Sequence, residues 1–329
     1  MAEITLTAVT ATRGWTEAVK NGSVPLAATG DRFAFRFEEV PVIIQAFRRM
    51  VRSLDFDVTE MAFTTYLCAR SFGKPFTALP VFLVRGFHHG AITRSVAAGP
   101  PVSADAVPQA LEGRRVGVNR GYTVTTGVWA RGILADQYGV DLSRVTWVPS
   151  GDEHVAEYQP PPNVVPAGPG EDVPAQVASG ELAAGVGFPG SAFPTDGPDV
   201  APLLPSAEQA GYDALRDHGL YPINHLLVVR NELLAAHPEL APALFAAYAT
   251  AKQQYVARLR AGAITDPDPA DRMNQRVMEI TGADPLPYGI APNRAMIDRL
   301  VRYAVSQQIL DKPVSAEELF AAGTHDLVA

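Results

Sequence analysis

The stretch VFLVRGFHHG, residues 81–90, joins an apolar run to an arginine, a glycine and two adjacent histidines. The apolar run is typical of a buried strand, and the polar residues that follow it mark the end of that strand. On both sides of this stretch, short strand-like runs alternate along the chain with segments of helical periodicity. This alternation predicts an α/β fold in which residues 81–84 form a buried strand.

The expected elements follow from the spacing of apolar residues and from the positions of proline and glycine. Strands are expected at residues 4–9, 33–40, 56–63, 76–84, 114–121 and 145–150. Helices are expected at residues 41–54, 64–72, 125–139, 238–259 and 292–305. Residues 158–174 hold six prolines, which predicts a surface loop. Ser315 and Glu318 have the spacing of a capping box.

The composition favours a folded protein whose partner is a small molecule. The 329 residues are 47% apolar and 19% charged, which suffices for two domains with a large core. The formal charge is -8 and long runs of like charge are missing. The sequence therefore indicates neither a nucleic acid nor an anionic membrane as a partner.

The sequence also lacks signals for a membrane or for export. No uninterrupted apolar segment approaches the roughly 18 residues of a membrane-spanning helix. The first residues, MAEITLTAV, have neither the basic nor the apolar region of a secretory signal, and the single cysteine, Cys68, cannot form an internal disulfide. We therefore expect a cytoplasmic protein.

A resemblance to a known family is carried by five segments in order along the chain: FDVTEMAFTTYL, PFTALPVFLVRGFHHG, RRVGVNRGYTVTTGVWARGIL, GLYPINHLLVV and YGIAPNRAMIDRLVRYA. These segments resemble the 4,5-dihydroxyphthalate decarboxylase family, and the similarity runs from about Ile4 to Phe320. The resemblance implies a two-lobed fold similar to the type II periplasmic solute-binding proteins, without export, and a ligand cleft between the lobes.

The implied lobes divide the chain discontinuously. Lobe I is expected to comprise residues 1–93 and 222–329, and lobe II is expected to be the inserted residues 94–221. The chain is expected to cross between them near GAITRSV and YPINHLLVV. Ligands of α/β proteins usually bind at the carboxyl ends of strands, so the candidate residues are sought near these crossings.

The same resemblance implies a decarboxylase of a hydroxylated aromatic, phthalate-like or related carboxylic acid. This reaction delivers a proton to the carbon that loses CO2, so it needs a general acid and donors for the carboxylates. We expect no cofactor and no metal. The alternatives are a binding protein for small anions that does no chemistry and another biosynthetic enzyme on the same scaffold. A homo-oligomer is compatible with the sequence.

Three histidines are the candidates for the general acid, because histidine titrates nearest neutral pH. His88 and His89 end the opening stretch beside the first crossing, and in an extended chain only one of them faces a given side. His225 lies at the second crossing, next to Asn224, where it is expected to face the cleft. The alternative for His88 and His89 is that one caps a strand hydrogen bond and the other is solvated, and the alternative for His225 is a satisfied core residue.

A Thr-rich turn, NRGYTVTTGVW, is the candidate for binding a substrate carboxylate. Thr123, Thr125 and Thr126 precede a helix, where hydroxyls and backbone N–H groups converge on an anion, and Arg120 and Tyr122 lie just before them. The alternative is an ordinary Thr-capped helix with a surface arginine. This turn departs from the shorter segment common in the family, which leaves the identity of the substrate open.

The other candidates for substrate binding are polar groups at strand ends, with turn or capping roles as the alternative. They are Arg13, Thr64, Thr65, Arg85, Asn224 and His154. Arg85 either contacts substrate or braces the hinge. His154 lies in the segment GDEHVAEY, which is more typical of a solvated acidic loop. A metal site of His88, His89, His154 and Glu153 is not expected, because adjacent histidines on a strand point apart.

Overall fold

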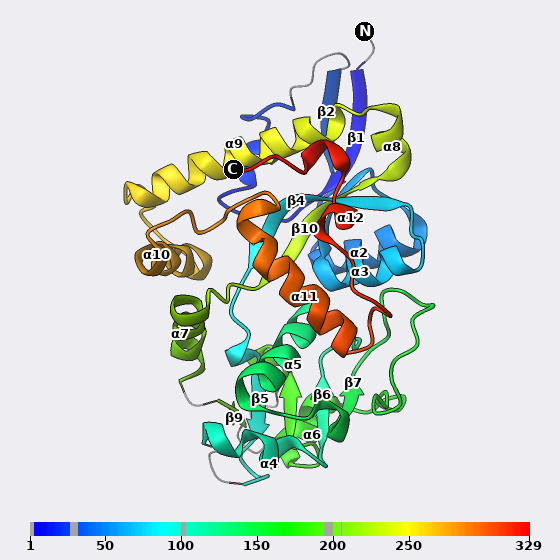
Figure 1. The fold of residues 1–329 in the computed structure, drawn as a ribbon, viewed down its shortest axis with the longest axis vertical. Helices are drawn as coiled ribbons and strands as arrows, with labels where there is room; N and C mark the ends of the chain where they lie inside the picture. Colours follow the sequence, from blue (N-terminus) through cyan, green and yellow to red (C-terminus); the bar gives the residue numbers. More distant parts are fainter. Residues whose placement is uncertain (1–2, 27–31, 100–102, 194–199, 205) are drawn as a thin grey trace. The chain divides into compact units, whose positions relative to one another are not determined.

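The chain forms two compact units of α/β structure (Figure 1). The computed structural model describes residues 3–26, 32–99, 103–193, 200–204 and 206–329. Unit 1 comprises residues 1–85, 223–299 and 313–329, and unit 2 comprises residues 86–222 and 300–312. The first unit is thus built from both ends of the chain, and the second comprises the middle of the chain and a short segment near the C-terminus.

Unit 1 contains a five-stranded sheet in the order β2-β1-β3-β10-β4. Its strands are β1 (Glu3–Val9), β2 (Arg32–Phe37), β3 (Val58–Ala62), β4 (Phe76–Arg85) and β10 (Ile223–Arg230). β1 is parallel to β2 and β3, whereas β10 is antiparallel to both of its neighbours, β3 and β4. The reversed strand, β10, is the one by which the chain re-enters unit 1.

The helices of unit 1 are α1 (Glu17–Lys20), α2 (Ile43–Ser53), α3 (Phe63–Ser71), α8 (Asn231–Ala236), α9 (Leu240–Arg260), α10 (Pro269–Thr281) and α12 (Ala316–Leu319). Of these helices, α2, α3, α8 and α9 pack against strands of this sheet (Figure 1). α9 contacts β4 and α1, α2 contacts β3, and α3 contacts β10. Two 3-10 turns, η5 (Ala291–Asn293) and η6 (Ala322–Thr324), also belong to this unit.

Unit 2 contains a second five-stranded sheet with the same arrangement of strand directions. Its strands are β5 (Ile92–Ser95), β6 (Arg115–Val118), β7 (Thr146–Pro149), β8 (Ala184–Val186) and β9 (Val200–Pro202). Their order is β7-β6-β8-β5-β9, with β6 parallel to β7 and β8, and β5 antiparallel to β8 and β9. The reversed strand, β5, follows the point where the chain enters unit 2.

The helices of unit 2 are α4 (Val107–Leu111), α5 (Thr125–Tyr138), α6 (Val173–Ser179) and α7 (Ala207–His218). Its 3-10 turns are η1 (His89–Ala91), η2 (Ala104–Ala106), η3 (Leu142–Arg144) and η4 (Gly190–Ala192). α11 (Arg294–Ser306) begins in unit 1 and ends in unit 2, where the hydroxyl of Tyr303 donates to Asp136 at 2.5 Å.

Most of the expected elements are confirmed, with small shifts at their ends. The expected helix 41–54 begins at Ile43 instead of Pro41, and the expected strand 33–40 ends at Phe37. The capping box is confirmed, because Ser315 and Glu318 bond reciprocally at the start of α12. The proline-rich stretch 158–174 contains no strand or helix before α6, as expected for a loop.

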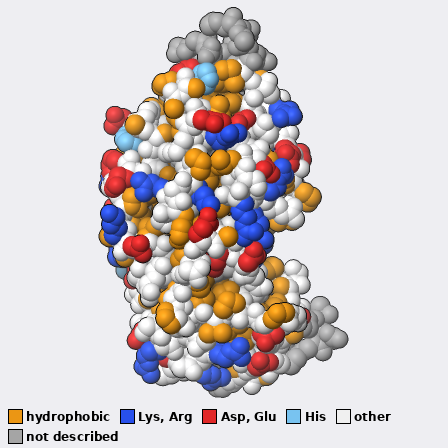
Figure 2. All heavy atoms as spheres, turned by 90° about the vertical axis from the view of Figure 1, so that its right-hand side faces the viewer, with side chains coloured by type: hydrophobic (Ala, Val, Ile, Leu, Met, Phe, Trp, Pro, Cys, Tyr) orange, Lys and Arg blue, Asp and Glu red, His pale blue; other side chains and the backbone are white. Residues whose placement is uncertain are grey.

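The surface of the described residues mixes charges of both signs. Figure 2 shows acidic and basic side chains interspersed on one face, without a broad region of a single sign. Among the described residues, no helix combines the length and apolar character needed to cross a membrane.

Candidate functional site

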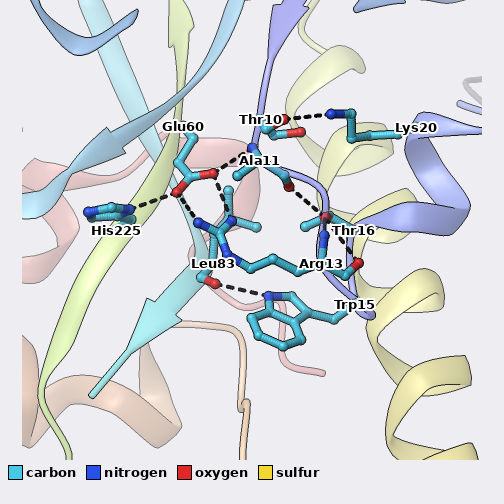
Figure 3. Close-up of polar contacts among 9 residues, drawn as sticks. All are labelled: Thr10, Ala11, Arg13, Trp15, Thr16, Lys20, Glu60, Leu83 and His225. Atoms are coloured by element: carbon cyan, nitrogen blue, oxygen red, sulfur yellow. Dashed lines mark hydrogen bonds and ion pairs between the residues drawn. The ribbon is translucent and has the colours of Figure 1, made fainter. Parts of the chain in front are cut away.

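A buried carboxylate, Glu60 of β3, organises a polar cluster in unit 1 (Figure 3). Arg13 donates to both of its oxygens, from Nη1 to Oε2 at 2.9 Å and from Nη2 to Oε1 at 2.8 Å. The backbone N–H of Ala11 donates to Oε2 at 3.0 Å, and Nδ1 of His225 lies 2.7 Å from Oε1. Each oxygen therefore has two partners. We call Arg13, Glu60 and His225 the Glu60 cluster.

The loop that follows β1 holds Arg13 in this position. The hydroxyl of Thr16 accepts from the backbone N–H of Arg13 at 2.9 Å and donates to the carbonyl of Ala11 at 2.8 Å. The indole N–H of Trp15 donates to the carbonyl of Leu83 at 2.9 Å, which ties the loop to β4. These hydrogen bonds fix the loop, and the loop in turn positions the guanidinium of Arg13 next to Glu60.

A β-bulge precedes His225 on β10. Ile223 lies opposite Arg85 and His225 lies opposite Val84, so Asn224 is an extra residue in the pairing of β10 with β4. Bulges of this kind redirect side chains and are frequent beside functional sites. On the other side of β10, the pairing with β3 places His225 on the same face as Glu60, at diagonal positions.

The charges of the cluster fix the protonation of Glu60. Burial alone would raise its pKa, but the charge of Arg13 and the hydrogen bonds from His225 and Arg13 outweigh burial and hold the pKa well below its usual range. An ionised carboxylate only accepts hydrogen bonds, so Nδ1 of His225 carries a proton. The other ring nitrogen, Nε2, is the one available for chemistry.

His225 combines a fixed orientation with access to solvent. Its side chain is 17% exposed, whereas that of Glu60 is fully buried. Phe47 packs edge-on against the imidazole, with ring centroids 5.1 Å apart. Nε2 makes no hydrogen bond to any described residue. A histidine held through Nδ1 by a buried carboxylate has the arrangement of a general acid or base.

Three other predicted residues of unit 1 lie at the ends of β3 and β4. Thr64 and Thr65 are buried in the first turn of α3, as expected from the sequence. Arg85 ends β4, where its guanidinium donates to the side-chain oxygen of Asn293 and to the carbonyl of Pro287. Arg85 is therefore held by the segment that precedes α11, within unit 1.

His88 and His89 belong to unit 2, and both are buried. Nε2 of His89 lies 2.8 Å from the amide oxygen of Gln137 at the end of α5, while its Nδ1 is buried without a described partner. Burial lowers the pKa of His89, and the hydrogen bond to Gln137 opposes this only partly. The neutral form of His89 is therefore favoured in the folded protein.

The Thr-rich turn of unit 2 holds a carboxylate of the protein itself. The backbone N–H of Tyr122 donates to Oε1 of Glu153 at 2.5 Å. The backbone N–H and the hydroxyl of Thr123 donate to Oε2 at 3.2 and 2.6 Å. A Cβ atom at position 121 would lie 2.5 Å from this carboxylate, so any larger residue there would displace the side chain of Glu153. The donors of Tyr122 and Thr123, just before α5, thus bind the protein's own Glu153, and binding of a substrate carboxylate by this turn stays a prediction.

Two arginines flank this turn. Arg120 has a φ of 65°, a left-handed conformation that costs a non-glycine residue about 1–3 kcal/mol and is frequent at functional sites. Its guanidinium makes no hydrogen bond or ion pair to a described residue, and burial lowers its pKa. Arg131 is fully buried, donates to the carbonyl of Tyr122 at 2.6 Å and lies over the ring of Tyr122 at 3.9 Å.

The remaining predicted residues of unit 2 lie close to the same turn in the chain. Thr125 and Thr126 are the first two residues of α5, and His154 is buried beside Glu153 in sequence. Among the described residues, no group of three or more His, Cys, Asp and Glu side chains is arranged to hold a metal ion.

Sequence reasoning missed Glu60, and it gave Glu153 little weight. Glu60 has a signal in the sequence, because it is the one charged residue in the run VTEMAF, residues 58–63, and the structure buries all five residues of β3. Charged residues are almost never fully buried unless they are paired. Glu153 has no comparable signal, because an acidic residue in a polar loop is ordinarily solvated.

The fold is shared with solved structures of two kinds. The periplasmic aliphatic sulphonate-binding protein SsuA from Escherichia coli aligns over 97% of this chain and 91% of its own, with a TM-score of 0.51 and 10% identity. The desulfurization enzyme DszB in complex with biphenyl-2-sulfinic acid aligns over 98% and 97%, with a TM-score of 0.53 and 16% identity. The protein therefore has the two-lobed α/β fold of the periplasmic solute-binding proteins.

Two curated relatives define the family. The 4,5-dihydroxyphthalate decarboxylase of Comamonas testosteroni is 29% identical over 288 residues, which cover 84% of this chain and 85% of the relative. That of Pseudomonas putida is 32% identical over 181 residues, which cover 52% of this chain and 68% of the relative. The chain belongs to the 4,5-dihydroxyphthalate decarboxylase family. No model of a protein family matches the sequence.

Proposed function

We propose that the protein is a cofactor-independent decarboxylase of a hydroxylated aromatic or related carboxylic acid, with His225 as the proton donor. The relatives named decarboxylases support the reaction class. The observation that carries the assignment of the donor is the 2.7 Å contact between Nδ1 of His225 and the buried carboxylate of Glu60. This contact leaves Nε2 as the reactive nitrogen.

The proton balance of the reaction matches this arrangement. The bond between the ring carbon and the carboxylate breaks, CO2 leaves, and the electron pair that remains on carbon takes a proton from Nε2 of the imidazolium. Ionised Glu60 stabilises the imidazolium before transfer and keeps the ring oriented after it. The neutral imidazole then regains a proton from solvent, so the cycle needs no cofactor.

Arg13 has a positioning role in this proposal. Its bidentate contact fixes both oxygens of Glu60, and the 2.7 Å contact then orients the imidazole. His88 and His89 remain second candidates for proton transfer. The substrate-binding role remains proposed for Thr64, Thr65, Arg85, Arg120, Tyr122, Thr123, Thr125, Thr126, His154 and Asn224.

The alternative is a protein that binds a small organic anion without transforming it. The structural similarity to SsuA, whose name describes sulphonate binding, favours this alternative. The similarity to DszB, an enzyme on the same fold that was solved with an aromatic sulfinic acid, supports catalysis. The Glu60 cluster distinguishes the two, because binding an anion does not require a histidine that is oriented by a buried carboxylate.

The proposal is tested by incubating the purified protein with 4,5-dihydroxyphthalate and related hydroxylated aromatic acids while CO2 release is followed. His225→Gln preserves a hydrogen-bond donor toward Glu60 but cannot deliver a proton, so kcat should fall by about 10²–10⁴-fold. The matched control is His237→Gln, because His237 is 20% exposed and lies 3.8 Å from Glu239 in the same unit. This control should keep full activity.

Three results would contradict the proposal. Turnover by His225→Gln at the wild-type rate would exclude His225 as the donor. An equal loss in His237→Gln would show that the effect is not specific to the cluster. Acids that raise the melting temperature of the wild-type protein without any release of CO2 would favour the binding protein.

A further inference from the structure

A cavity in unit 2 has the character of a second ligand site. Its volume is about 420 Å³, within the range of small-molecule pockets. It is lined by Arg94, Ser95, Ala98, Gly99, Ser103, Ala106, Gln109, Ala110, Arg114, Ala183 and Leu203. All of these residues belong to unit 2. We call it the Arg94 cavity.

The Arg94 cavity and the Thr-rich turn lie at opposite ends of the parallel strands of this sheet. Arg114 directly precedes β6, and Arg94 pairs with Ala184, the first residue of β8, which is parallel to β6. The Thr-rich turn follows the carboxyl end of β6. The four residues of β6 separate the two ends by about 10 Å. The cavity is therefore distinct from the turn proposed to bind substrate.

The cavity contains positive charge that the described protein leaves uncompensated. Arg94 is only 8% exposed, and its Nη1 donates to the carbonyls of Ser95 and Gly99 at 3.1 and 2.8 Å. Its Nε and Nη2 make no hydrogen bond to a described residue, and no described carboxylate pairs with Arg94 or with Arg114. A buried guanidinium is costly when no carboxylate of the described residues is its counter-ion, and this favours binding of a further anion.

The rest of the lining indicates what kind of anion fits. Five apolar side chains, those of Ala98, Ala106, Ala110, Ala183 and Leu203, line the cavity beside the two arginines, and the described lining contains no acidic side chain. A planar guanidinium grips a carboxylate with two parallel hydrogen bonds, while apolar walls bury a carbon skeleton. A fully hydrated inorganic anion would gain nothing from these walls.

We propose that the Arg94 cavity binds a small organic carboxylate, whose charged end contacts Arg94 and Arg114 and whose apolar body contacts the alanines and Leu203. This second site is independent of the Glu60 cluster, which belongs to unit 1. It holds whether or not the protein is a decarboxylase, because it depends on the charge and lining of unit 2 alone.

The test is isothermal titration of the full-length protein with benzoate and, separately, with inorganic phosphate. Arg114→Ala removes an exposed side chain, and it should weaken benzoate binding by about tenfold or more, the effect of losing one charged hydrogen bond. The matched control is Arg115→Ala, which removes the same charge from the neighbouring residue, outside the lining. This control should bind benzoate like the wild type.

A further variant separates this site from the Glu60 cluster. His225→Gln should leave the Arg94 cavity unchanged, so one benzoate site per chain should remain. Loss of the benzoate site in His225→Gln would overturn the proposal. The variant Arg94→Lys is measured beside Arg114→Ala, and benzoate affinities in both variants equal to that of the wild type would also overturn it. Phosphate that binds as tightly as benzoate would overturn the assignment of an organic ligand, and so would the absence of benzoate binding to the wild type.

Discussion

Replacing Glu60 by Gln tests whether a buried charge holds the candidate site together. Gln preserves the size of the side chain but removes the charge that pairs with Arg13 and His225. Removing one partner of a buried ion pair costs about 3–5 kcal/mol. The side chain of Arg13 is 19% exposed, so water compensates part of its charge, and we expect a loss of about 2–4 kcal/mol in the free energy of unfolding.

The loss should depend on pH in a direction set by the pKa of Glu60. This pKa lies well below its ordinary value of 4.5, because the cationic partner and the hydrogen bonds outweigh the effect of burial. The unfolded chain therefore binds the proton more readily than the folded protein does. Ionised Glu60 contributes stability above about pH 4.5, and this contribution is lost progressively as the pH falls through and below that value. Glu60→Gln should thus differ most from the wild type at neutral pH.

Urea unfolding followed by circular dichroism gives the free energy of unfolding of the wild type and of Glu60→Gln at about pH 7 and at about pH 4. The difference between the two proteins should be smaller at about pH 4. Glu239→Gln serves as the control, because Glu239 is 27% exposed and lies 3.8 Å from His237. A surface change of this kind should alter stability by less than about 0.5 kcal/mol. A loss in Glu60→Gln no larger than in this control would refute the reasoning.

A double-mutant cycle keeps the test informative where Glu60→Gln alone folds poorly. Arg13→Met with Glu60→Gln removes both charges, so it should be more stable than the sum of the two single losses predicts. Strict additivity of the two losses would show that the observed pair has no energetic coupling.

Two further changes probe unit 2. His89→Gln removes a buried histidine whose pKa lies below its ordinary value of 6.5. The melting temperature of the wild type should therefore fall relative to that of this variant as the pH falls below about 6.5. An unchanged pH dependence would contradict this. Gly132→Ala places a Cβ 2.1 Å from the ring of Tyr303, so unit 2 should lose about 1–3 kcal/mol in urea unfolding, although alanine normally favours a helix. Gly190→Ala, with no atom within 4 Å of its Cβ, should cost little, and equal effects would refute the packing argument.

Local patterns were sufficient for most of the fold. Apolar alternation and turn residues predict β1, β3 and β4, and the spacing of Leu240, Leu244 and Tyr248 predicts α9. Local patterns do not show which elements pack together, because this depends on contacts between residues far apart in the sequence. The periodicity of residues 292–305 predicts α11, but the contact of Tyr303 with Asp136 determines that the last turns of this helix pack in unit 2. Such a contact leaves no trace in the local sequence.

In the candidate site, too, local sequence predicts single residues but not which of them lie together. Arg13 and His225 were predicted separately, each at a strand end, and nothing in their own segments relates one to the other. The structure relates them through Glu60, which lies 47 residues from Arg13 and 165 from His225. A lone acid in a fully buried strand is the local signal that was available, because burial of an ionised group requires nearby partners.

Internal carboxylates explain why donors predicted for a substrate proved to be occupied. The N–H groups of the Thr-rich turn bind Glu153, and the guanidinium of Arg13 binds Glu60. Sequence reasoning recognises donors but cannot recognise a distant acceptor that satisfies them. The groups that the described residues leave without a partner are therefore more informative, and they include Nε2 of His225 and the guanidinium of Arg120. The imidazole is the proton donor that we propose in unit 1, and the guanidinium of Arg120 is a permanent cation of unit 2, so each is tested by its own substitution.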